Sequence, residues 1–151
     1  MSITNKKCLI CQRIKLIKQG KNPYFIKELT TGYAVLGDYQ FFPGYCLLLC
    51  KFHKTELHQL DQKFKLKFLD EMSQLAEAVF KTFKPDKLNY ELLGNQDKHL
   101  HWHIFPRYKK EKKFNKPIWL ESKKVRQAKK YILDKNEVKK VILKIRKNLA
   151  N

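Results

Sequence analysis

The chain has 151 residues, 43% of them hydrophobic and 13% aromatic, which is enough for one domain with a sizeable core and argues against wholesale disorder. Its 33 basic and 14 acidic residues give a formal net charge of +19, which favours polyanionic partners, although solvated lysines on helix faces would produce the same charge. The longest apolar run, residues 46–50, is too short to span a membrane. We therefore expect no membrane partner, and the lack of an export signal predicts a cytoplasmic protein without disulfides.

The four cysteines form two pairs, for which the sequence predicts different roles. Cys8 and Cys11 have the C-x-x-C spacing that suits a metal site or a redox pair. Cys46 and Cys50 lie in a strand-like run, where residues four apart are separated by about 13 Å. They cannot bind one ion together, so we expect both in the core.

The middle of the chain predicts strands followed by a long helix. Residues 24–50 alternate apolar stretches with turn signals, which predicts an antiparallel meander. Residues 61–83 predict a helix, with Asp61 as its N-cap and Pro85 just beyond its end. The apolar residues of this helix recur at spacings of three and four: Phe64, Phe68, Met72, Leu75, Val79 and Phe83.

Two more strands and a basic tail complete the chain. The strands are expected at 88–93 and 100–105, with a turn between them and Pro106 closing the second. The last 45 residues hold 17 bases and 4 acids, a net charge of +13, against +6 for the first 106, which hold 16 bases and 10 acids. The tail is expected to become helical from about Glu121. One apolar stripe predicts that its last helix packs on the rest: Val138, Val141, Ile142, Ile145 and Leu149.

Three of the five histidines lie within five residues. Because side chains alternate along a strand, His99, His101 and His103 share one face, while the large apolar residues between them take the core face. Three imidazoles on an open face can bind a metal. Alternatively, one can act as nucleophile or base while its neighbours orient it and hold an anion. A chance His-rich surface strand fits poorly with the large apolar residues between them.

This run resembles the signature of the histidine triad (HIT) superfamily of nucleotide hydrolases and transferases. The segments 88–95 and 99–107 resemble its bacterial branch often labelled diadenosine polyphosphate hydrolase-like. Upstream, the C-x-x-C pair, Gly44 before an apolar strand and Lys51-Phe52-His53 occupy places typical of the family. The resemblance implies an α+β fold, with an antiparallel sheet of about five strands and helices on one side, and a homodimer. It divides the chain into a HIT-like catalytic domain, 1–107, and a basic, mostly helical C-terminal extension, 108–151, packed on it.

The resemblance also implies a mechanism and its residues. His101 would attack the α-phosphorus of a nucleotide and form a covalent nucleotidyl-histidine, which water then hydrolyses. His103 would hydrogen-bond the phosphate or the leaving-group oxygen, and Asn95 would orient a phosphate oxygen. His99 completes the catalytic set, and no organic cofactor is expected.

A structural zinc is implied by the zinc-containing members of the family. Their four ligands correspond here to Cys8, Cys11, His53 and His99, a usual Cys₂His₂ set. The alternative is that both cysteines are free thiols and His99 hydrogen-bonds within the triad. A redox role is less favoured, because the pair does not open the helix of a βαβ unit.

The chain departs from the family pattern near the expected substrate. Many members have Gly-His where this chain has Gly44-Tyr45, so a phosphate-side contact would be lost. Asp38 falls near the position that holds the ribose, and Arg107 is a candidate for binding phosphate, with a rim charge as the alternative. His58 is interpreted as structural or surface.

These observations favour a nucleotide hydrolase that cleaves dinucleoside polyphosphates, such as diadenosine tetraphosphate, or related nucleotide conjugates. One alternative is a nucleotidyl transferase or phosphorylase with the same intermediate, and His103 in place of the glutamine of many transferring relatives favours hydrolysis. Another is a nucleic-acid-binding protein that uses the basic tail, although the tail lacks recognisable recognition motifs.

Overall fold

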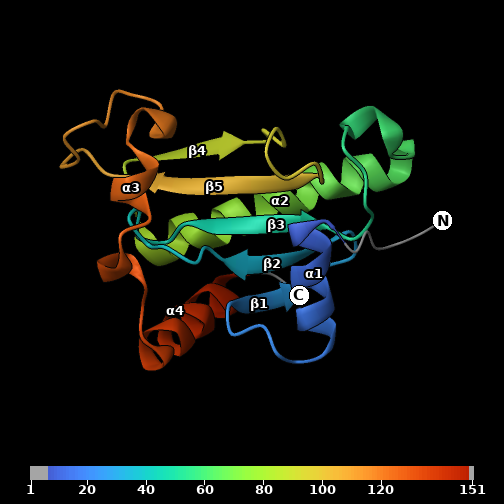
Figure 1. The fold of residues 1–151 in the computed structure, drawn as a ribbon, viewed down its shortest axis with the longest axis horizontal. Helices are drawn as coiled ribbons and strands as arrows, with labels where there is room; N and C mark the ends of the chain where they lie inside the picture. Colours follow the sequence, from blue (N-terminus) through green and yellow to red (C-terminus); the bar gives the residue numbers. More distant parts are fainter. Residues whose placement is uncertain (1–6, 150–151) are drawn as a thin grey trace.

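The computed structural model describes residues 7–149, and its centre is one five-stranded antiparallel sheet (Figure 1). The strand order is β1-β2-β3-β5-β4, so the fold is α+β as expected. The strands are β1 (Phe25–Glu28), β2 (Gly32–Leu36), β3 (Cys46–Cys50), β4 (Lys87–Glu91) and β5 (His101–Arg107). The predicted meander over residues 24–50 is confirmed as β1, β2 and β3, and β5 lies between β3 and β4.

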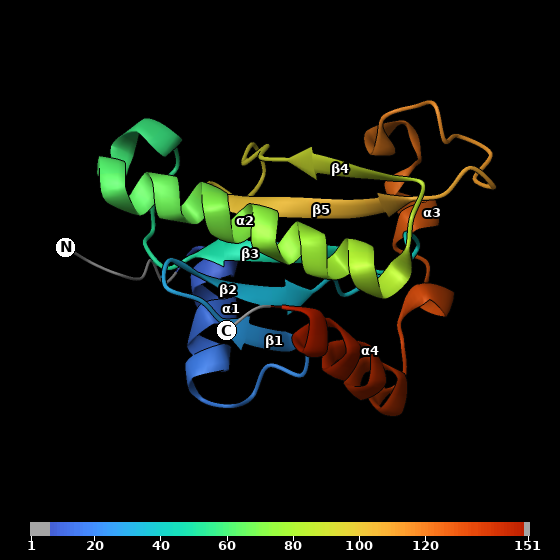
Figure 2. The same ribbon diagram turned by 180° about the vertical axis from the view of Figure 1, so that it is seen from behind.

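Two helices cover one face of the sheet. They are α2 (Gln62–Phe83) and α4 (Lys135–Asn148), which lie side by side and are seen in front of the strands in Figure 2. The Asp61 carboxylate caps α2 by accepting the Phe64 N–H at 3.0 Å, as predicted. The main core lies between these helices and the sheet and includes Leu48, Ile104, Phe68, Leu75, Val79, Ile142 and Ile145. None of the helices in the described part of the chain is long and apolar enough to cross a membrane.

The other face of the sheet is only partly covered. The short helix α1 (Leu9–Lys18) packs there, with Ile10 and Ile14 against Tyr33, Val35 and Leu49. The expectation of helices on one side describes α2 and α4, whereas α1 lies opposite them. Figure 1 shows that α1 lies over only one end of this face.

The carboxylate of Glu71, on α2, lies in the core and was not expected there. Its side chain is 2% exposed and accepts the backbone N–H groups of Thr30 and Thr31 at 2.8 and 2.9 Å, as well as the Thr31 hydroxyl. A buried carboxylate is tolerated only when its oxygens have such donors. Glu71 therefore fastens the β1–β2 turn to α2.

Cys46 and Cys50 lie in the core, as predicted. Both are 0% exposed on the face of β3 that meets α2. Burial raises the pKa of the Cys50 thiol to about 11, which disfavours the thiolate that a metal requires.

The end of β5 and the tail differ from the expectation. Pro106 does not close the strand, which continues to Arg107. β3 pairs with β5 only as far as Ile104, so the missing N–H of Pro106 interrupts no hydrogen bond with β3. Beyond it, helical turns begin near the expected start, but only α4 is long. The shorter ones are η2 (Ile118–Leu120), α3 (Lys123–Arg126) and η3 (Lys129–Tyr131).

The C-terminal segment is packed on the rest of the protein. It crosses one end of the sheet, next to the end of β5 (Figure 1). Then α4 packs against β1 on the same face of the sheet as α2 (Figure 2). Four residues of the predicted stripe, Val138, Ile142, Ile145 and Leu149, are buried in the main core, and Val141 packs against it. The tail therefore shares one core with the sheet.

Candidate active site

His101 and His103 lie next to each other on β5, on the face of the sheet that α1 shares. Across β3 they pair with Leu49 and Leu47, and their ring centroids are 4.6 Å apart. Ile104 points to the opposite face and is 0% exposed. The expected alternation along this strand is therefore confirmed. His99 lies in a bend before β5 begins and turns towards α1.

The backbone around His101 decides which of its ring nitrogens is available. Its Nδ1 lies within hydrogen-bonding distance of the carbonyl oxygen of His99, and a carbonyl can only accept. The proton of neutral His101 therefore sits on Nδ1, and the lone pair is on Nε2. Burial lowers the pKa of His101, which keeps the ring neutral at pH 7. A neutral imidazole with a free Nε2 lone pair is a competent nucleophile.

Tyr45 holds the second histidine. Its hydroxyl is 2.7 Å from Nδ1 of His103, and its ring stacks on Phe105 at a centroid distance of 4.2 Å. Burial, with smaller effects of His101 and Arg126, lowers the pKa of His103 to about 3, so this ring is neutral as well.

The hydroxyl of Tyr45 acts as the donor in this pair. Burial raises the pKa of Tyr45 well above its usual value, so the hydroxyl keeps its proton. The reverse assignment would leave this O–H without an acceptor among residues 7–149, at the cost of an unsatisfied buried group. Donation to Nδ1 places the proton of His103 on Nε2, where it can be given to a ligand. Tyr45 stands where many family members have a histidine that we expected to contact phosphate. In this structure its hydroxyl contacts His103 instead.

The two histidines line a cavity of about 450 Å³. Its walls include residues of α1, of the loop after β4 and of the C-terminal segment, and Figure 1 shows where these elements lie around the sheet. This volume is in the range of small-molecule sites. Asn95, in the loop after β4, is exposed and lines the cavity, so the structure brings it to His101 and His103 as expected.

The two charged residues expected near substrate are placed differently. Asp38 lines the cavity, but both its carboxylate oxygens accept from the guanidinium of Arg13, on α1. Arg107 is 2% exposed and does not line the cavity.

The expectation that Arg107 binds phosphate is not supported. Its guanidinium donates to Glu111 and Asn89 at 2.8 Å each, and to backbone carbonyls of residues 113, 114 and 116. Every N–H direction is used inside the protein, so Arg107 anchors the segment that follows β5. His58 is exposed and outside the cavity, in agreement with its interpretation as a surface residue.

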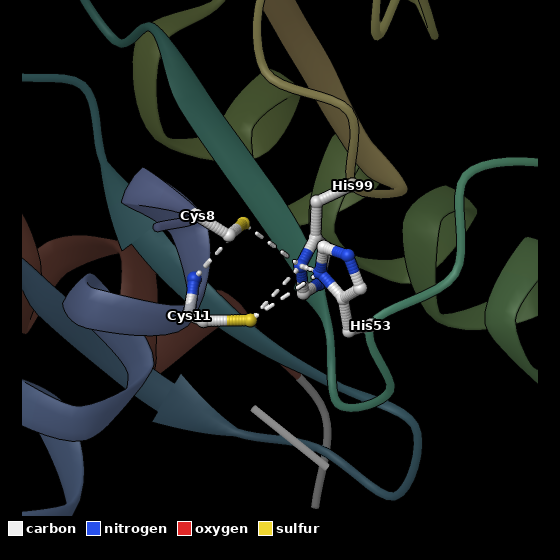
Figure 3. A group of neighbouring side chains, drawn as sticks. All are labelled: Cys8, Cys11, His53 and His99. Atoms are coloured by element: carbon white, nitrogen blue, oxygen red, sulfur yellow. Dashed lines mark hydrogen bonds between the residues drawn. The ribbon is translucent and has the colours of Figure 1, made fainter. Parts of the chain in front are cut away.

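Four side chains of types that can bind a metal, Cys8, Cys11, His53 and His99, converge beside the cavity (Figure 3). Cys8 precedes α1 and Cys11 lies on it, His53 lies in the loop after β3, and His99 precedes β5. One ligand atom from each lies within 4.8 Å of all the others. The sulfur–nitrogen distances are 3.5 Å from Cys8 to His99, from Cys11 to His53 and from Cys11 to His99, and the two Nδ1 atoms are 3.2 Å apart.

These distances fit one tetrahedral ion. With zinc–sulfur bonds of about 2.3 Å and zinc–nitrogen bonds of about 2.0–2.1 Å, neighbouring ligands lie about 3.5 Å apart for S–N and about 3.3 Å for N–N. His99 also has the outer contact that such ligands need, because its Nε2 lies 2.9 Å from the Cys50 carbonyl and leaves Nδ1 for the ion. The four residues could therefore hold a metal.

Sequence reasoning missed three residues of the site: the Tyr45 hydroxyl as a partner of His103, Arg13 as the partner of Asp38, and Arg126 in the cavity wall. The only local signal was the departure from Gly-His at Tyr45. Arg13 and Arg126 reach the site through the packing of helices, which no local pattern reveals.

Comparison with known proteins gives a consistent result. The model of the HIT domain family matches residues 24–110. A histidine triad protein from Bradyrhizobium japonicum is 24% identical, with a TM-score of 0.73 over 83% of this chain and 90% of its own. A hypothetical histidine triad nucleotide-binding protein from Sulfolobus tokodaii is 21% identical, with a TM-score of 0.69 over 92% of this chain and 91% of its own.

A more distant structure is the diadenosine triphosphate hydrolase of Plasmodium falciparum, solved in complex with cyclomarin A. It is 14% identical, with a TM-score of 0.57 over 83% of this chain and 75% of its own. At these identities, the solved structures establish a shared fold. A search of curated proteins finds no match.

Proposed function

The chain belongs to the HIT domain family, and on this premise we propose that it is a nucleotide hydrolase with a covalent nucleotidyl intermediate on His101. Its proposed substrates are dinucleoside polyphosphates, such as diadenosine tetraphosphate, or related nucleotide conjugates. The observation that carries the proposal is the tautomer of His101. Its Nδ1 is bound to the His99 carbonyl, and its Nε2 is left for a ligand in the cavity.

The first step joins substrate to protein. Nε2 of His101 attacks the α-phosphorus, a P–N bond forms, and the P–O bond to the leaving group breaks. His103, with its Nε2–H, is placed to hydrogen-bond the leaving-group oxygen or a phosphate oxygen. Asn95 offers an amide donor from the loop after β4. Such donors stabilise the charge that develops on phosphate oxygens.

The second step releases the product. Water attacks the phosphorus of the nucleotidyl-histidine, the P–N bond breaks, and a nucleoside monophosphate leaves. His101 returns to its neutral form with the lone pair on Nε2. The hydrogen bond from Nδ1 to the His99 carbonyl supports the first step, because it stabilises the positive charge that develops on the substituted ring.

We also propose that Cys8, Cys11, His53 and His99 hold a structural zinc ion. When bound, zinc would supply four bonds that join α1, the loop after β3 and the segment before β5, with no open position for substrate. The geometry connects this cluster to the nucleophile, because His99 contributes both a ligand and the carbonyl that orients His101. From the same resemblance we propose a homodimer, which light scattering in solution would test.

The test is product analysis with two substrates and three proteins. Wild type, His101→Ala and the exposed control His58→Ala are each given diadenosine tetraphosphate and adenosine phosphoramidate, and products are separated by chromatography. We expect nucleoside monophosphate from wild type and the control, and none from His101→Ala. Denaturing the protein at alkaline pH, where a P–N bond survives, during turnover of labelled substrate should trap label on wild type and the control, and none on His101→Ala.

Inorganic phosphate distinguishes hydrolysis from transfer. If phosphate intercepts the intermediate, nucleoside diphosphate replaces the monophosphate, and the transferase alternative is correct. A His101→Ala variant as active as wild type would exclude His101 as the nucleophile.

A further inference from the structure

The basic C-terminal segment forms one wall of the active-site cavity. Trp119, Lys123, Arg126 and Gln127 all line the cavity that contains His101 and His103. This wall belongs to α3 and the turn before it, which lie at the end of the sheet where β5 finishes (Figure 1). The positive tail is therefore part of the site.

The side chain of Arg126 is held by one hydrogen bond within the described residues, and its terminal guanidinium N–H groups remain available. Its Nε donates to the backbone carbonyl of Glu121 at 3.0 Å, and its side chain is half-buried. Within residues 7–149 its terminal guanidinium nitrogens have no hydrogen-bond or ion-pair partner. Its charge nevertheless acts on the site, because it lowers the pKa of His103 and opposes the rise that burial causes in the pKa of Glu91.

The other charges in the wall leave this end of the cavity positive. Arg13 and Asp38, which both line the cavity, neutralise each other in an ion pair. Asp97 is a further acidic residue of the cavity wall and lies in the loop after β4. Glu91 pairs with His103 across the β4–β5 ladder and lines the cavity, where it is the one acidic residue beside that histidine in the described part of the chain. Two cations, Lys123 and Arg126, stand against it.

The direction of the strand links these cations to the leaving group. Along β5, His103 follows His101 towards the end of the sheet that α3 crosses. A leaving group that contacts His103 therefore lies on the α3 side of the attacked phosphorus. A guanidinium and an ammonium are the groups that bind phosphate oxygens with charge-assisted hydrogen bonds.

We propose that Lys123 and Arg126 form a subsite for the leaving-group phosphates, which makes nucleotides with a polyphosphate chain beyond the α-phosphate the preferred substrates. The proposal rests on the proposed function, since it assumes that His101 attacks the α-phosphorus. As the P–O bond breaks, negative charge grows on the departing phosphate, and the two cations stabilise it.

The test compares two leaving groups. When its α-phosphorus is attacked, diadenosine tetraphosphate releases adenosine triphosphate, a leaving group with three phosphates, whereas adenosine phosphoramidate releases ammonia and has no further phosphate. The variants are Arg126→Ala, Lys123→Ala and the double variant. The matched control is Lys124→Ala, the neighbouring residue on α3, which does not line the cavity.

We expect kcat/KM for diadenosine tetraphosphate to fall about 10- to 100-fold in Arg126→Ala, the usual effect of losing a hydrogen bond to a charged group. Activity on the phosphoramidate should change less than about threefold. The control should change neither, because its charge lies outside the cavity. Equal losses on both substrates would show that Arg126 acts on the common machinery and would overturn the subsite, as would no loss at all.

A binding measurement separates the subsite from the reaction. Wild type and the double variant are titrated calorimetrically with inorganic tripolyphosphate. We expect the double variant to bind about 10-fold or more weakly, while Lys124→Ala binds as wild type does. If wild type cleaves neither substrate, the proposed function fails, and this titration still decides the subsite. Equal binding by wild type and the double variant would overturn it.

Discussion

Replacing Tyr45 with phenylalanine removes one hydroxyl from the active site and leaves its aromatic stack intact. The Tyr45 ring lies on Phe105 with an interplanar angle of 7°, and a phenylalanine ring preserves this contact. What is lost is the hydrogen bond of 2.7 Å to Nδ1 of His103. Without it, nothing fixes the proton of the neutral ring on Nε2.

The size of the effect follows from the burial of this pair. A part-buried acceptor that loses its donor costs about 1–3 kcal/mol. Because about 1.4 kcal/mol corresponds to a factor of ten, the preference for the Nε2–H tautomer falls about 5- to 150-fold. We expect kcat of Tyr45→Phe to fall within that range, with little change in KM, because the cavity keeps its shape.

The assay is steady-state hydrolysis of diadenosine tetraphosphate, together with thermal unfolding. The matched control is Tyr108→Phe, because the Tyr108 hydroxyl donates to the Pro43 carbonyl at 3.0 Å in an exposed contact. The control should keep wild-type kcat. If Tyr45→Phe also keeps it, or if both variants lose activity equally, Tyr45 does not orient His103 and the tautomer argument is wrong.

Three further predictions concern the metal, the tail and the approach to Tyr45. Wild type should contain about one zinc per chain by elemental analysis, whereas Cys11→Ser should lose it and unfold at a lower temperature; a metal-free wild type would exclude the site. Arg107→Ala should lose about 3–5 kcal/mol of unfolding free energy in denaturant titration, because it leaves the Glu111 carboxylate and several carbonyls unpaired. The exposed Lys81→Ala should lose no more than about 0.5 kcal/mol, and similar losses in both would contradict the structural role of Arg107. Gly37→Ala should lower kcat, because its Cβ would lie 2.2 Å from Cδ1 of Tyr45 and displace that ring. Gly20→Ala, whose Cβ meets nothing within 4 Å, should affect stability only, through its φ of +67°; equal activity in the two variants would count against the clash.

Local patterns in the sequence were enough for the secondary structure around the site. The three-and-four spacing of apolar residues and the Asp61 cap predicted α2 to within a residue, because a helix is determined by contacts within one or two turns. The alternation around His101 and His103 predicted which side chains share a face for the same reason, since a strand repeats every two residues. The family resemblance predicted a set of four possible ligands, Cys8, Cys11, His53 and His99, which the sequence pattern alone left open, and the structure brings their side chains close enough to hold one metal ion.

Only the tertiary structure decided how distant segments meet. Cys8 and His99 lie 91 residues apart, and they come together because α1 packs on the sheet face beside the start of β5. Arg107 looked like a phosphate ligand by its place after the histidines. The segment after β5 folds back, however, and together with Asn89 on β4 it accepts from every donor of the Arg107 guanidinium.

The basic tail and Tyr45 likewise reach the site only through the tertiary structure. The sequence by itself determined that the last third of the chain is strongly positive and ends in an amphipathic helix. That α4 joins the core, that α3 thereby places Arg126 in the cavity, and that β3 places the Tyr45 hydroxyl against His103 follow from packing and strand register. Such contacts depend on the whole arrangement of the chain, because the residues that make them lie too far apart in sequence for any local repeat to encode them.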